Sequence, residues 1–96
     1  MNPNMMNKLK QMQKEMMAAQ EKLEKTEFVG KATGVSVVML GNRQLIDVKI
    51  DPELLSEHEI LQDAVLMAVN NAISQIDKAQ EESMGRFSGG LGGFGF

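Results

Sequence analysis

The chain has 96 residues, a net charge of −3 and no cysteine, so it forms one small domain and holds neither a disulfide nor a thiolate catalyst or metal ligand. Its N-terminus lacks the apolar segment of a signal peptide, and no apolar run approaches the ~18 residues that span a membrane. These absences predict a cytoplasmic protein with no membrane partner.

The first predicted element is a helix over residues 3–25, because Asn2 can cap a helix and Pro3 suits its first position. Apolar side chains recur in it at alternating spacings of four and three residues, the repeat of a helix that packs against another helix. We call this set the apolar seam: Met5, Leu9, Met12, Met16, Ala19 and Leu23. Because methionine packs adaptably, a methionine-rich seam favours either a helix pair of adjustable separation or ordinary core filling.

The lysines of the same helix fall on the arc opposite the seam, at about 100° per residue. They are Lys8, Lys10, Lys14, Lys22 and Lys25. Lysine is a flexible point charge and not a planar fork, which favours contact with backbone phosphates over the reading of base edges. One side of the helix is therefore predicted to meet another helix, and the other side to meet an anion.

Three strands are predicted next, over residues 27–32, 35–40 and 46–50. Apolar residues recur at every second position in the second and third strands, and Gly41-Asn42 separates them as the turn of a β-hairpin. Thr33-Gly34 closes the first strand, so the three form an antiparallel meander. The second and third strands are apolar on parts of both faces, and we expect both faces of the sheet to be covered.

A second long helix follows the sheet. Asp51-Pro52 ends the third strand, because proline cannot continue a ladder of hydrogen bonds. Ser56 and Glu59 have the spacing of a capping box, and the helix is predicted over residues 57–84 with its end at Gly85. Apolar residues cover more than half of its circumference near the middle, so either the first helix or a second chain must cover what the sheet does not.

The composition divides the chain into a single domain over residues 1–85 and a flexible, glycine-rich tail over residues 86–96. Phe87, Phe94 and Phe96 lie in this tail. They are either part of a frayed terminus or apolar groups that dock on a partner or stack on bases.

The sequence lacks the residue sets that enzymes use. His58 is the only histidine, and it falls in the predicted first turn of the second helix. There is no nucleophile–base set, no metal-ligand spacing and no phosphate-binding loop that opens onto a helix. We therefore expect no catalytic residue, metal, cofactor or small-molecule substrate.

Charge is divided unevenly along the chain. Residues 1–25 carry five lysines and three glutamates, whereas residues 51–84 carry eight acidic residues and one lysine. Such a partition predicts that one face meets an anionic partner, although two solvated helix faces give the same counts.

The order of these segments resembles the YbaB/EbfC family of bacterial nucleoid-associated proteins over nearly the whole chain. The most specific parts are residues 48–55 (VKIDPELL) and the Lys/Gln/Met repeat of residues 10–14. The resemblance implies an α+β fold of α-β-β-β-α order and a tweezer-like homodimer, in which paired sheets form the body and the helices form projecting arms. The family binds duplex DNA with limited or variable sequence preference and alters its conformation. Ser36 departs from similar sequences, which often carry lysine there.

Together these features predict a non-enzymatic, homodimeric DNA-binding protein of the bacterial cytoplasm and nucleoid, with roles in nucleoid organisation and gene regulation. The lysines of the first helix, which match the family's basic arm, would contact phosphates, assisted by Arg43, Lys49 and Arg86. The alternative is a protein-interaction adaptor for recombination or replication machinery, with its partner on the methionine-rich seam and the phenylalanine-bearing tail.

Overall fold

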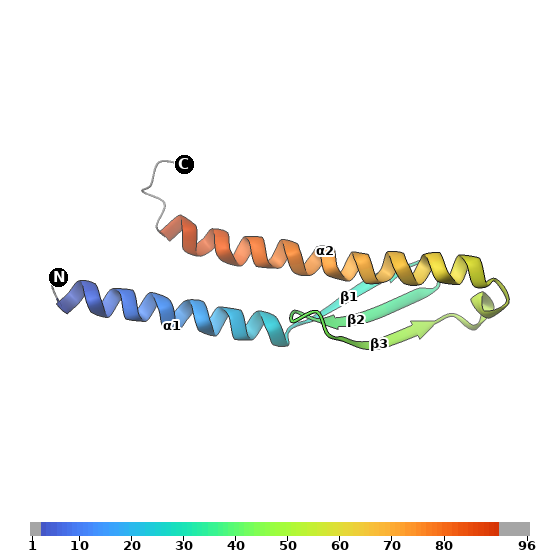
Figure 1. The fold of residues 1–96 in the computed structure, drawn as a ribbon, viewed down its shortest axis with the longest axis horizontal. Coiled ribbons are helices and arrows are strands. Elements are labelled where there is room, and N and C mark those ends of the chain that lie inside the picture. Colours follow the sequence, from blue (N-terminus) through green and yellow to red (C-terminus); the bar gives the residue numbers. More distant parts are fainter. Residues whose placement is uncertain (1–2, 91–96) are drawn as a thin grey trace.

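The computed structural model describes residues 3–90, and the side chains of residues 3–85. Helix α1 (Pro3–Lys25) leads into strands β1 (Glu27–Ala32), β2 (Val35–Leu40) and β3 (Leu45–Ile50). A short 3₁₀ helix, η1 (Pro52–Ser56), and helix α2 (His58–Gly90) complete the order (Figure 1). The α-β-β-β-α order predicted from the sequence is confirmed, and the predicted bounds of α1, β1 and β2 agree with the structure.

The three strands form an antiparallel meander in the order β1-β2-β3. Gly34 sits in the β1–β2 turn with φ +74°, a left-handed conformation that glycine adopts without strain. The β2–β3 register shifts between Val38 and Met39, so β3 carries a bulge near its start.

The core lies between α2 and one face of β1 and β2. Val35, Val37 and Met39 alternate along β2 and are buried, and small residues of α2 pack against this face. The buried residues of α2 recur every fourth position: Ala64, Ala68, Ala72 and Ile76. A Cβ on Gly30 of β1 would lie 2.1 Å from the Ala68 carbonyl oxygen, so glycine and alanine together let the helix backbone approach the sheet closely.

The two edges of the sheet differ. At β1, Gln75 Nε2 donates to the Val29 carbonyl oxygen (2.7 Å) and the Lys31 N–H donates to Asn71 Oδ1 (3.2 Å). At β3, every residue is exposed. Val48 lies opposite Val37 in the register and therefore on the face that α2 packs against, but α2 lies over β1 and β2. The expectation that both sheet faces are covered is thus wrong within the described residues of one chain, because α2 lies on one face, over β1 and β2, and leaves β3 exposed.

Two local predictions around α2 are also wrong. Ser56 does not form the capping box, because its hydroxyl donates to the Glu53 carbonyl oxygen within η1, and α2 begins at His58. Helix α2 does not end at Gly85 as predicted but continues to Gly90. Gly85 does not have the left-handed φ of a C-terminal cap, so it lowers helix propensity without ending the helix. Residues 86–90 of the predicted flexible tail are therefore helical, and Phe94 and Phe96 lie outside the described residues.

The chain is long and thin. Its radius of gyration is 19.2 Å and its extents are 68 × 26 × 11 Å, whereas a compact chain of this length has a radius of gyration near ~13 Å. Figure 1 shows the cause: α1 and the C-terminal part of α2 run side by side beyond the sheet. We call the sheet with residues 58–76 of α2 the body, and α1 and residues 77–90 of α2 the two arms.

Candidate nucleic-acid interface

Helix α1 presents its lysines to solvent along its whole length. It contains no buried residue, and Lys8, Lys10, Lys14, Lys22 and Lys25 are all exposed. Among the side chains of residues 3–85, the one ion pair joins Arg43 to Asp77, so no lysine of α1 is neutralised by an ion pair. The helix therefore carries five available cations on a projecting rod.

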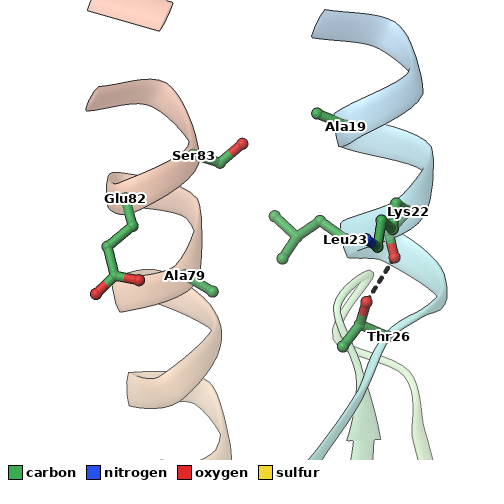
Figure 2. Close-up of a pocket in the computed structure, with 7 residues that line it drawn as sticks. All are labelled: Ala19, Lys22, Leu23, Thr26, Ala79, Glu82 and Ser83. Atoms are coloured by element: carbon green, nitrogen blue, oxygen red, sulfur yellow. Dashed lines mark hydrogen bonds between the residues drawn. The ribbon is translucent and has the colours of Figure 1, made fainter. Parts of the chain in front are cut away.

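The apolar seam faces α2 near the base of the arms. Ala19 and Leu23 are half-buried and line a groove of about 360 Å³ whose other wall is Ala79, Glu82 and Ser83 of α2 (Figure 2). Farther out, Met12 is half-buried, whereas Met5, Leu9 and Met16 are exposed. Among the described residues, the outer seam thus keeps exposed apolar surface at Leu9 and Met16.

The end of α1 is held by a local contact at the bottom of this groove. The Thr26 hydroxyl donates to the Lys22 carbonyl oxygen (2.6 Å), as the dashed line in Figure 2 shows. This bond satisfies a carbonyl group that the end of a helix leaves without a backbone donor. Lys22 of α1 and Glu82 of α2 both line this groove. Lys22 thus lies beside the seam residues Ala19 and Leu23, and the prediction that every lysine of α1 lies opposite the seam is wrong for it.

Arg43 does not lie free on the surface as a phosphate contact would. Its Nη2 forms an ion pair with Asp77 Oδ1 and donates to Gln80 Oε1 (3.5 Å), and both partners are on α2. In this structure, Arg43 makes a contact inside the chain. Arg86, the other predicted arginine contact, belongs to α2, but its side chain lies outside the described residues, as does that of Phe87.

Lys49 belongs to a row of polar side chains that was not predicted from the sequence. The register aligns Lys31 of β1, Ser36 of β2 and Lys49 of β3 across the sheet face opposite α2. The three line a hollow of about 380 Å³, with Asp51 at its edge. The sequence analysis did not name Lys31 as a candidate site residue. The predicted meander could have indicated it, because locating the β1–β2 turn places Lys31 opposite Ser36.

The same sheet face is acidic at its other end. Glu27 and Asp47 lie opposite Leu40 and Val38, toward the base of α1. The lysines of the sheet and those of α1 are therefore separate cationic regions with carboxylates between them.

The described residues offer no catalytic or metal-binding arrangement. No group of three or more His, Asp or Glu side chains in the described part of the chain could hold a metal ion, and His58 is exposed at the start of α2. Between residues 3 and 90, no helix is long and apolar enough to cross a membrane. What the geometry provides is an exposed, lysine-bearing arm, which suits the binding of a polyanion.

Comparisons with known proteins agree with this class. The model of the YbaB/EbfC DNA-binding family matches residues 1–91. Nucleoid-associated proteins of Enterococcus faecalis and Lactococcus lactis subsp. cremoris are 39% and 40% identical to this chain, covering 94% and 92% of it and 90% and 93% of the relatives. The crystal structure of an uncharacterized protein from Helicobacter pylori matches with a TM-score of 0.69 at 27% identity, over 85% of this chain and 91% of that chain.

The chain belongs to the YbaB/EbfC DNA-binding family. This is a family of nucleoid-associated, DNA-binding proteins and not of enzymes.

Proposed function

We propose that this protein works in the bacterial cytoplasm as a homodimer that binds duplex DNA through its backbone phosphates and changes the conformation of the DNA. Its roles are nucleoid organisation and gene regulation. The observation that carries the proposal is α1, a 23-residue helix with no buried residue and five exposed lysines. Membership of a DNA-binding family supports DNA as the polyanion.

The spacing of the lysines suits phosphates. Lys8, Lys14 and Lys22 are about 9 and 12 Å apart along the axis of α1 at 1.5 Å per residue. Duplex DNA carries about one negative charge per 1.7 Å of axis, so each of these lysines can reach a phosphate without a fixed register. Such contacts carry no sequence information by themselves, which supports binding with limited sequence preference.

Exposed apolar surface supports the homodimer. Ile46, Val48 and Ile50 of β3 are exposed, and Leu66 and Met67 of α2 are exposed by 62% and 63%. Side chains of α2 bond the edge strand β1, whereas every residue of the other edge strand, β3, is exposed. An uncovered strand edge beside apolar side chains invites pairing with another chain, and a second copy of the same chain is the usual partner.

A salt titration tests the phosphate contacts. If the dimer contacts about six phosphates, the logarithm of its affinity for a random-sequence duplex falls with the logarithm of salt concentration at a slope near −5. The triple variant Lys8→Gln, Lys14→Gln and Lys22→Gln should flatten this slope and weaken all duplex sequences alike. Fluorescence anisotropy at several salt concentrations measures both quantities.

The matched control is Lys78→Gln, which removes one exposed cation from α2. It should leave the slope close to that of the parent protein. If the triple variant has an unchanged slope, the lysines of α1 do not contact phosphates and the assignment is wrong.

A further inference from the structure

The β2–β3 turn, residues 41–44, is bonded to the end of α1. The Gly41 N–H donates to the Thr26 carbonyl oxygen (3.0 Å), and the Asn42 N–H donates to the Glu24 carbonyl oxygen (3.3 Å). A Cβ on Gly41 would lie 1.8 Å from the Leu23 carbonyl oxygen, so the turn and the helix end are packed backbone against backbone. The turn therefore fixes where the first arm leaves the body.

The same turn is bonded to α2 through Arg43. The Arg43 guanidinium is paired with Asp77 and also donates to Gln80. Asp77 follows Ile76, the last buried residue of α2 between residues 58 and 85, so the contact falls where the second arm begins. Beyond this point the groove of Figure 2 separates the two helices. One short turn thus contacts the bases of both arms.

The backbone at Arg43 is unusual for a residue with a long side chain. Its φ is +70°, in the left-handed region that glycine and asparagine occupy more readily. The hydrogen bonds of the turn do not use the Arg43 side chain. The Arg43 N–H donates to the Leu40 carbonyl oxygen, and the Gln44 N–H donates to Asn42 Oδ1. The contact of the guanidinium with α2 gives a reason for arginine at a position where glycine fits best.

We propose that Arg43 is a positioning residue that, through Asp77, sets the spacing between the second arm and the first, lysine-bearing arm. The inference rests on the proposed function for its consequence, but the arm spacing can be measured without DNA. Residues 77–90 span about 20 Å of helix, so a rotation of about 10° at Asp77 moves the end of the arm by about 3 Å. A small change at the turn therefore alters the space that the second arm leaves beside the lysine-bearing α1.

The expected effect is modest, because the Arg43 and Asp77 side chains are 42% and 55% exposed. Exposed ion pairs of this kind correspond to changes of about two- to fivefold in an equilibrium constant. We expect Arg43→Gln and Asp77→Asn to weaken duplex binding by such a factor.

Comparing these two variants separates positioning from direct binding of DNA. If Arg43 only positions the arm, both variants weaken binding and neither changes the salt slope. If Arg43 instead binds a phosphate, Arg43→Gln lowers the magnitude of the slope by about 0.9 for each phosphate that the arginine neutralises in the parent complex. Asp77→Asn then strengthens binding, because it removes a negative charge and frees the arginine. That pair of results would overturn the proposal.

The arm spacing itself is measured with spin labels, since the chain has no cysteine of its own. Gln13→Cys on α1 and Glu81→Cys on α2 place one label on each arm, at exposed positions. The labelled chain is mixed with excess unlabelled chain, so that each pair of labels reports on one chain, and double electron–electron resonance gives the distance distribution. Arg43→Gln, Arg43→Gly and Asp77→Asn should broaden or shift this distribution, and Lys78→Gln should leave it unchanged.

The exchanged pair Arg43→Asp with Asp77→Arg provides the rescue. It restores the opposite charges, and aspartate tolerates a positive φ better than most residues do, so the parent distance distribution should return. Unchanged arm distances in all single variants would refute the positioning role, whatever the variants do to DNA binding. A parent protein that binds no DNA, with arm distances that respond as expected, would refute the proposed function and leave the positioning role standing.

Discussion

The body and the arms of this chain are held in place in different ways. In the body, Val37, Ala68, Ala72 and Ile76 have no exposed surface, and α2 packs directly on the sheet. In the arms, α1 has no buried residue, and no residue of α2 between 77 and 85 is buried. The body is therefore stabilised by its own core, whereas the arms are held at their bases and are otherwise open to a partner.

We infer from this difference that the two regions have different functions. A helix with a partly exposed apolar seam and a lysine face gains little stability from its own chain, because most helix stability in proteins comes from tertiary packing. A rigid base with two projecting rods is instead suited to contact something large between or beside them. The variants that follow test whether body and arms differ as the structure indicates.

The largest contrast is expected between Ile76→Ala and Met16→Ala. Ile76 is fully buried in the body, so truncation removes core packing and leaves a cavity, at a cost of about 3–4 kcal/mol. Met16 is an exposed seam residue, so its truncation should cost less than about 1 kcal/mol. Urea unfolding at one fixed protein concentration measures both.

Equal costs for these two variants would contradict the comparison. They would mean that α1 is as well covered as the core, by a second chain that buries the seam, because this chain leaves Met16 exposed.

Much of the fold could be predicted from the sequence, because its signals are local. The alternation of Val35, Val37 and Met39 identified β2 in the body, and the seam repeat together with the Asn2-Pro3 start identified α1 in the first arm. Both patterns depend only on the period of the element and on one buried or half-buried face. The four-residue spacing of Ala64, Ala68 and Ala72 likewise lay within one helix.

Contacts between segments far apart in the chain could not be predicted from the sequence. Arg43 resembled a free cation in the sequence, but its partner Asp77 is 34 residues away. Lys31 joined Lys49 only through the register of three strands. The error at Gly85 was local: its φ is not positive, so a residue type that commonly ends helices does not end α2.

A smaller effect is expected on the exposed side of the body, at β3. Val48→Lys should cost little in a single chain, because Val48 is already exposed, but it places a charge in the surface that the proposed dimer would bury. We expect the dimer to weaken by about 2 kcal/mol, or roughly thirtyfold in its dissociation constant. Sedimentation equilibrium measures this change.

The control is Asp47→Lys, on the same strand but on the face opposite α2. A dimer that tolerates Val48→Lys and dissociates with Asp47→Lys would show that the copies meet through the other face of the sheet. A parent protein that is monomeric at all concentrations would rule out the dimer itself.

The smallest expected effect is a gain of stability in the second arm. Gly85 lies within α2 with a helical backbone, and a Cβ added there meets no atom within 4 Å. Gly85→Ala should therefore raise helix stability by up to about 1 kcal/mol, because alanine loses less backbone entropy in a helix than glycine does. Thermal unfolding monitored by circular dichroism should show a slightly higher Tm, with duplex affinity equal to or above that of the parent. A variant that is more helical but binds DNA more weakly would mean that the arm bends at Gly85 when it engages the duplex. A rigid arm would then be a disadvantage for binding, whereas a rigid body is not.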